Sequence, residues 1–188
     1  RMDLGMTYEA AGLNELAELT YDQYIRLFPK RVIGWYRHAV VSHHQGKVSQ
    51  AISSLEQAAQ LAPPEMDSPH WQLALWYIDV GDIEKAKKQI DIANAKKPNS
   101  IQLQIAKARL AMEEKKFDLA ISILENQSLI AKVPDGYVYQ LLGRAYRAVG
   151  EVEQSKLAWS RAGNSKPKWA DPWTQTVISH IAGLRAER

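Results

Sequence analysis

The stretch that decides the fold is residues 141–167, LLGRAYRAVGEVEQSKLAWSRAGNSKP. Within it, Gly143 is followed by a glycine seven positions later, a tryptophan sixteen positions later and a proline at the end. Glycine readily adopts the left-handed conformation that closes a helix, and proline cannot continue one. The stretch therefore predicts two helices joined by a tight turn, with Gly143 providing room where the helices meet.

The same pattern occurs five times along the chain. The small residue returns at intervals of 34, 35, 34 and 35 residues, at Gly5, Ala39, Ala74, Ala108 and Gly143. The turn residue follows it, at Gly12, Gly46, Gly81, Lys115 and Gly150. A large residue comes next, at Tyr21, Leu55, Ile90, Leu124 and Trp159, and four units end in proline, at Pro29, Pro63, Pro98 and Pro167. Such a period predicts a stacked helical repeat array. We expect the large residues to fill the gap between neighbouring units.

At these residues the chain resembles the tetratricopeptide repeat family. The resemblance implies an all-α fold, a tetratricopeptide-type α-solenoid in which antiparallel helix pairs form a right-handed superhelix. It places the units at about 1–31, 32–66, 67–100, 101–135 and 136–169 of a single repeat domain, 1–188. The fourth unit departs most, because Lys115 replaces the turn glycine and Lys132 stands where proline is expected. We expect an irregular end to that unit.

Both ends of the sequence carry further expectations. Residues 171–186 place Trp173, Val177, Ile181 and Leu184 on one helical face, which predicts a capping helix over the last unit. The pattern at 168–173, KWADPW, is similar to the ends of repeat domains in bacterial proteins. Because Leu4 and Gly5 already lie within the first helix, we expect the chain to be a fragment of a larger protein.

Composition excludes several classes of site. The 188 residues contain no cysteine, which excludes disulfides and thiolate metal sites and leaves the compartment open. No apolar run reaches the roughly 18 residues that a membrane span needs. The net charge is +3, and residues 136–188 hold eight Lys and Arg against four Asp and Glu. This surplus is small and is not interleaved with aromatic residues, so nucleic acid is a poor candidate partner.

No pattern predicts catalysis, a metal or a cofactor. His43 and His44 are adjacent, so on a helix they point about 100° apart and cannot share one ion. His38 is expected to be a packed core histidine. Glu113 and Glu114 fall near a predicted helix end and are interpreted as solvated charges.

The predicted function is carried by a surface, the concave groove lined by the first helix of each unit. Its candidate residues are Tyr36, Arg37, Val40, His43, Trp71, Leu75, Ile78, Arg109, Met112, Gln140, Arg144 and Arg147. In chain order they change from aromatic and aliphatic to basic. Aromatic residues and arginine are enriched at binding hot spots, so we expect a protein or peptide partner with an acidic group on the three arginines.

Two other interpretations stay open. The apolar candidates could pack against the next helix, and the arginines could form a solvated face. The alternative function is a scaffold or regulatory segment of a larger protein, which packs on its own neighbouring domain or self-associates. Some members of the resembled family grip a terminal carboxylate with a lysine and an asparagine. Here Tyr36, Trp71 and Ile105 stand where that lysine would be, which argues against that mode.

Overall fold

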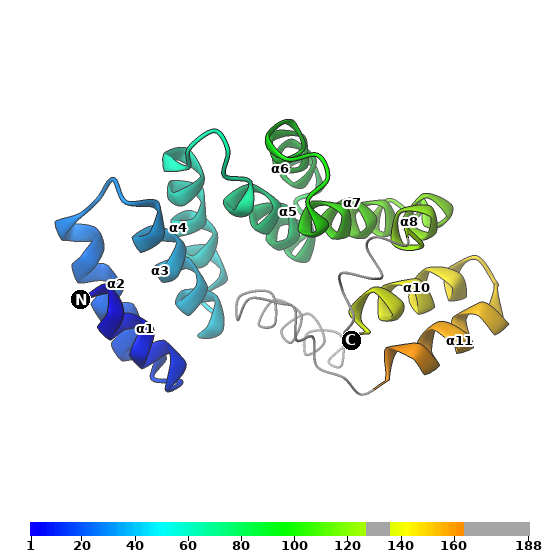
Figure 1. Ribbon diagram of the computed structural model, residues 1–188, viewed down its shortest axis with the longest axis horizontal. Helices are drawn as coiled ribbons and strands as arrows, with labels where there is room; N and C mark the ends of the chain where they lie inside the picture. Colours follow the sequence, from blue (N-terminus) through cyan, green and yellow to red (C-terminus); the bar gives the residue numbers. More distant parts are fainter. Residues whose placement is uncertain (127–135, 164–188) are drawn as a thin grey trace. The chain divides into compact units, whose positions relative to one another are not determined.

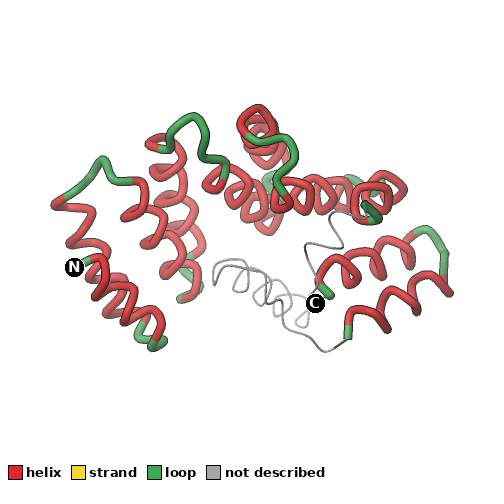
Figure 2. The backbone as a smooth tube through the Cα atoms, in the orientation of Figure 1, coloured by secondary structure: helices red, strands yellow, loops and turns green. Residues whose placement is uncertain are grey.

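The structure is a computed structural model that describes residues 1–126 and 136–163. Those residues form ten helices and no strand (Figures 1 and 2). The chain divides into two compact units, Arg1–Leu73 and Ala74–Arg188. The predicted capping helix, 171–186, lies outside the described residues, as do Lys132 and Pro167.

The first unit contains two complete helix pairs and the start of a third. Its helices are α1 (Met2–Ala10), α2 (Asn14–Leu27), α3 (Val32–His44), α4 (Val48–Leu61) and the first half of α5 (Ser68–Val80). Within this unit α2 packs against both α1 and α3, and α3 packs against α4. From α1 to α4 each helix therefore contacts its neighbour in sequence, as a repeat array requires.

The second unit continues the same order of short antiparallel helices. It holds the second half of α5, then α6 (Ile83–Lys96), α7 (Ile101–Glu113), α8 (Phe117–Leu124), α10 (Tyr137–Ala148) and α11 (Val152–Ala162). Helix α7 packs against α6 and α8, and α10 packs against α8 and α11. Asp82 and Ser100 cap the starts of α6 and α7, where their side chains accept hydrogen bonds from backbone N–H groups.

The predicted turns between paired helices are confirmed. Gly12, Gly46, Gly81 and Gly150 all have φ between 73° and 86°, in the left-handed region. Lys115, the one non-glycine at this position, adopts φ 61°. A side chain in this conformation costs about 1–2 kcal/mol. The fourth pair thus keeps the turn geometry at the expense of local strain.

The close approach of the two helices within a pair explains why the repeat has a small residue at this position. A Cβ atom on Gly143 would lie 2.7 Å from Nε1 of Trp159, and one on Gly5 would lie 2.5 Å from Cε1 of Tyr21. The expectation that the large residues fill the gap between neighbouring units was therefore incomplete. Each of these rings lies over the glycine of its own helix pair. Tyr21 also packs in a cluster with Val41 of the next pair.

Candidate interaction surface

The candidate groove residues of the first unit are mostly buried. Tyr36, Val40 and His43 on α3 and Trp71 on α5 are each at most 8% exposed. Arg37 is partly buried and reaches the carboxylate of Glu9, with Nη1 3.5 Å from Oε1. These apolar side chains are therefore buried by packing, which is one of the two interpretations that the sequence left open.

A second carboxylate in this unit, Glu18 on α2, is the centre of a polar cluster. Its Oε2 atom accepts hydrogen bonds from Nζ of Lys47 at 2.6 Å and Nε2 of Gln45 at 2.9 Å. Its Oε1 atom accepts one from Nε2 of Gln50 at 3.0 Å and a longer one from Ser42. Burial raises the pKa of Glu18, but the bonds from Lys47 and Gln45 and the charge of Lys47 outweigh it, so the net pKa is lowered. The cluster ties the first helix pair to the second.

His38 on α3 extends this cluster. As expected it is buried, at 4% exposed, and its Nδ1 lies 2.8 Å from Oγ of Ser54. Its Nε2 lies 3.2 Å from Oδ1 of Asp22 and 3.3 Å from Nε2 of Gln50. Burial lowers the pKa of His38, and this effect exceeds the opposing attraction of Asp22 and Glu18. His38 is therefore a structural residue that folds in its neutral form.

The pH dependence of stability follows from these groups. The folded pKa of His38 lies below its ordinary value of 6.5, so the unfolded chain binds this proton more readily. The contribution of His38 to stability should be complete above pH 6.5 and should be lost as the pH drops below that value. Glu18 adds a further loss in more acidic solution, below its ordinary pKa of 4.5.

Thermal unfolding at neutral pH and between pH 5 and 6 checks this expectation. About 1 kcal/mol shifts the midpoint of a chain of this size by roughly 2–4 °C, so the change is measurable. The variant His38→Gln should show a flatter pH dependence than the parent. Burial also lowers the pKa of His44, so part of the slope should remain. An unchanged slope in His38→Gln would show that His38 is protonated equally in both states.

In the second unit, the structure corrects the expected role of Arg109. The sequence pattern predicts that Arg109 is one of three arginines available to a partner. Instead it is 3% exposed, and its Nη2 lies 2.7 Å from Oδ1 of Asp79 on α5. Burial lowers the pKa of Arg109, but Tyr137 and Asp79 raise it more, so the net pKa of Arg109 is raised and its guanidinium stays charged. This arginine therefore connects α7 to α5. Leu75, Ile78 and Met112 are buried in the same unit.

The remaining candidates lie on α10. Gln140 and Arg144 are partly buried, and Arg147 is exposed near the end of the helix. They are spaced by four and three residues, so they share one face. Neither arginine forms an ion pair with another residue in the described part of the chain. The basic half of the predicted groove thus consists of Arg144 and Arg147.

A shallow hollow lies beside this face, between α8, α10 and α11. Its lining residues are Glu125, Tyr139, Leu142, Tyr146, Gln154, Leu157, Ala158 and Arg161. The hydroxyl of Tyr146 donates a hydrogen bond to Glu125, and the guanidinium of Arg161 lies 5.8 Å from the centre of the Tyr139 ring. Burial, followed by the bond to Glu125, raises the pKa of Tyr146 to about 12. Tyr146 therefore stays neutral at physiological pH.

Residues 1–126 and 136–163 contain neither a candidate metal site nor a candidate membrane span. Within these ranges no three His, Asp or Glu side chains are placed to hold a metal ion. No helix in the same ranges is long and apolar enough to cross a bilayer.

Known proteins share both the sequence pattern and the fold. Residues 2–65 match the family model described as tetratricopeptide repeat. The solved structure of the APC/C hetero-tetramer Cut9–Hcn1 superposes with a TM-score of 0.79 over 98% of this chain and 36% of that one, at 19% identity. A thermophilic repeat protein of Thermus thermophilus gives 0.71 over 98% and 97% of the two chains, at 15% identity. Residues 2–65 are therefore similar to the tetratricopeptide repeat family, and the chain has the fold of tetratricopeptide repeat proteins.

Other neighbours agree with this fold. The protein MamA superposes with a TM-score of 0.66 over 86% of this chain and 87% of MamA, at 19% identity. No sequence among curated proteins matches the chain. At these identities the solved structures establish the fold alone. Tetratricopeptide repeats are generally protein-interaction modules and typically non-catalytic scaffolds.

Proposed function

We propose that this chain is a non-catalytic interaction module that binds a peptide segment of a partner protein, with an acidic group of that segment on α10. The observation that carries the proposal is the basic face of α10. Arg144 and Arg147 lie one turn apart, and the helix sequence, YVYQLLGRAYRA, contains no acidic residue. Guanidinium groups bind carboxylates with charge-assisted hydrogen bonds.

The apolar candidates stay part of this proposal in a secondary role. Tyr36, Val40, His43, Trp71, Leu75, Ile78 and Met112 are buried, so a partner reaches them only where side chains rotate away. Arg37 and Arg109 already bind carboxylates of this chain, Glu9 and Asp79. We therefore expect the acidic group of a partner to bind Arg144 and Arg147. Gln140 is their neutral neighbour and can form a hydrogen bond to the same partner.

A charge reversal tests the proposal. A random peptide library selected on the parent chain should yield binders enriched in Asp and Glu. The double variant Arg144→Glu/Arg147→Glu should bind the selected peptides at least about tenfold more weakly, which corresponds to about 1.4 kcal/mol. Arg147 is exposed, and Arg144, although partly buried, forms no ion pair in the described part of the chain, so the helical content should be nearly unchanged. The affinity of the parent should fall as salt increases.

The matched control is Lys88→Glu/Lys97→Glu, two exposed lysines on and just after α6. It changes the net charge by the same amount away from α10, so it separates a local contact from general attraction. Selected peptides without acidic residues, or equal binding by both double variants, would contradict the proposal.

A further inference from the structure

The connection between α2 and α3 carries exposed apolar and basic side chains together. Phe28 and Ile33 are 48% and 42% exposed, and Lys30 and Arg31 between them are exposed as well. In Figure 1 this connection arches beyond the ends of the two helices that it joins. We call Phe28, Lys30, Arg31 and Ile33 the connection patch.

Hydrogen bonds hold the backbone of this connection in place. The N–H of Phe28 donates to the carbonyl oxygen of Tyr24 at 2.8 Å, and the N–H of Arg31 donates to that of Phe28 at 3.0 Å. The indole Nε1 of Trp35 donates to the carbonyl oxygen of Pro29 at 2.8 Å. The patch therefore projects from a fixed frame, which lowers the conformational entropy that binding would cost.

The connection patch lies between two helix pairs and not on an end of the array. The ring of Tyr24 is 5.0 Å from that of Phe28 and faces α3, since a Cβ atom on Gly34 would lie 2.8 Å from it. The second pair packs on α2 through α3, and at the start of α4 Lys47 reaches Glu18. By the same rule, a pair that preceded α1 would pack on α1 and on the start of α2. It would not pack on the connection at the other end of α2.

The charge around this connection is positive. Residues 23–55 contain no Asp or Glu. Arg26, Lys30 and Arg31 are exposed, and none of them forms an ion pair with another described residue. The other described connections between pairs differ, because 61–67, LAPPEMD, carries two acids and 96–100, KKPNS, has no large apolar residue. Exposed apolar and basic side chains without acids are therefore specific to the first connection among these three.

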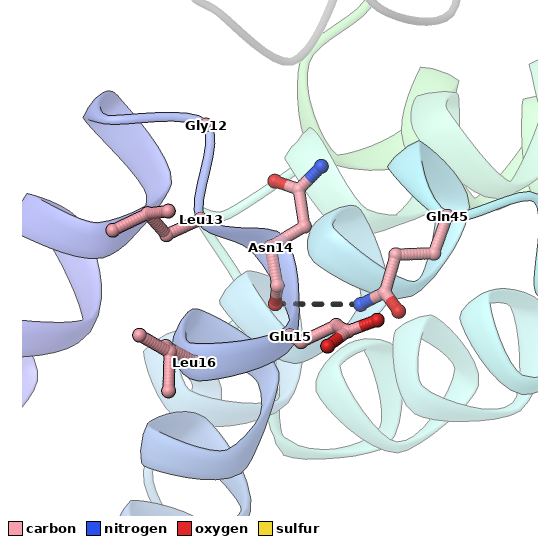
Figure 3. A pocket seen from close by; sticks show the side chains of 6 residues that line it. All are labelled: Gly12, Leu13, Asn14, Glu15, Leu16 and Gln45. Atoms are coloured by element: carbon pink, nitrogen blue, oxygen red, sulfur yellow. Dashed lines mark hydrogen bonds between the residues drawn. The ribbon is translucent and has the colours of Figure 1, made fainter.

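The shape of the patch indicates the kind of partner. Neither the hollow beside α10 nor the one at the turn between α1 and α2, lined by residues 12–16 and Gln45, includes any residue of the patch (Figure 3). A peptide that inserts an anchoring side chain needs a pocket to receive it. Here the apolar side chains themselves project, so they fit a partner that deforms around them. A lipid bilayer does this, and its anionic headgroups complement the bases.

We propose that the connection patch docks on a membrane surface that is rich in anionic lipids. Phe28 and Ile33 enter the boundary between headgroups and acyl chains, and Lys30 and Arg31 bind the lipid phosphates. Arg26 in the last turn of α2 adds a third positive charge. Trp35 and Tyr24, which contact the connection, are residue types that are enriched at this depth of a bilayer. This docking does not rest on the function proposed for α10.

Cosedimentation with lipid vesicles tests the charges of the patch. One kind of vesicle contains phosphatidylcholine alone, and the other contains equal parts of phosphatidylcholine and phosphatidylserine. The parent should bind the anionic vesicles at least about tenfold more tightly, and salt should release it. The variant Lys30→Glu/Arg31→Glu should lose at least about tenfold in this affinity. It places carboxylates at the start of α3, where the helix dipole favours them, so the helical content should be unchanged.

The matched control for charge is Lys88→Glu/Lys97→Glu, which changes the net charge equally and alters the connection after α6. It should keep most of the affinity of the parent. Equal loss of affinity in the two double variants would overturn the proposal, because binding would then follow the net charge and not the patch. Equal binding of the parent to both kinds of vesicle would overturn it too. So would binding to neither, which would leave the patch to a protein partner.

A second measurement tests the apolar residues. The variant Phe28→Ser/Ile33→Ser should bind anionic vesicles more weakly, whereas Leu119→Ser/Val152→Ser, which alters exposed residues of α8 and α11, should bind like the parent. Because the chain has no cysteine, an environment-sensitive fluorophore on Ile33→Cys reports insertion. Its emission should shift to the blue with anionic vesicles, and the same label on Leu119→Cys should not respond. An unchanged emission from the label at position 33 would contradict insertion of the patch.

Discussion

Replacing Glu18 by alanine should lower the free energy of unfolding by about 2–4 kcal/mol, one of the largest effects of any single substitution in the first unit. Glu18 is 9% exposed and accepts hydrogen bonds from Lys47, Gln45 and Gln50. Its removal leaves these donors without their acceptor. The expected cost is below that of a fully buried ion pair, because the Lys47 side chain is 44% exposed and can turn to water.

Chemical denaturation of three variants measures this effect. Glu15→Ala removes an exposed carboxylate one turn earlier on α2 and should change stability by roughly 0.5 kcal/mol or less. Glu18→Gln keeps one oxygen acceptor and should fall between the other two variants. If Glu18→Ala unfolds at the same denaturant concentration as Glu15→Ala, the hydrogen bonds of Glu18 contribute nothing measurable to stability, and other contacts hold the first two helix pairs together.

The fold could be predicted from the sequence because its rules are local and repeat. A left-handed turn residue, a small residue at the helix contact and a large ring over it are each set by backbone geometry within one helix pair. Five copies in register show the pattern even where one copy departs. Lys115 illustrates this, since it holds φ 61° at a position where the other units have glycine.

The polar contacts could not be predicted in the same way. Glu18 and Lys47 are 29 residues apart, and the positions equivalent to Glu18 in the next two units are Ile52 and Lys87. A repeat pattern carries no signal for a contact that occurs once.

The burial of a side chain could not be predicted from the sequence either. Helix geometry gives the direction in which Arg109 points, but whether that direction is open depends on what packs there. The carboxylate of Asp79, 30 residues earlier in the sequence, accepts a hydrogen bond from the guanidinium of Arg109. Arg147 on α10, by contrast, is exposed. Arg109 is therefore not accessible to a partner, whereas Arg147 is.

The fifth helix pair offers the second large effect. Gly143→Leu should cost about 1–3 kcal/mol or more, because even its Cβ would lie 2.7 Å from Nε1 of Trp159. The backbone at this point is also held, since Oγ of Ser155 donates a hydrogen bond to the carbonyl oxygen of Gly143 at 2.8 Å. Either α10 and α11 must separate or the indole must leave its place. Trp159 is 44% exposed, so the indole has a way out, which limits the cost.

A double-mutant cycle separates these two responses. If the clash with the indole dominates, Gly143→Leu should destabilise Trp159→Ala by less than it destabilises the parent. Ala148→Leu is the matched control, because it adds the same side chain at an exposed position of α10 and should be nearly neutral. Equal midpoints for Gly143→Leu and Ala148→Leu would show that the helices do not meet at Gly143. Additive effects of Gly143→Leu and Trp159→Ala would place the clash in the backbone of α11, since the leucine would then meet an obstacle other than the ring.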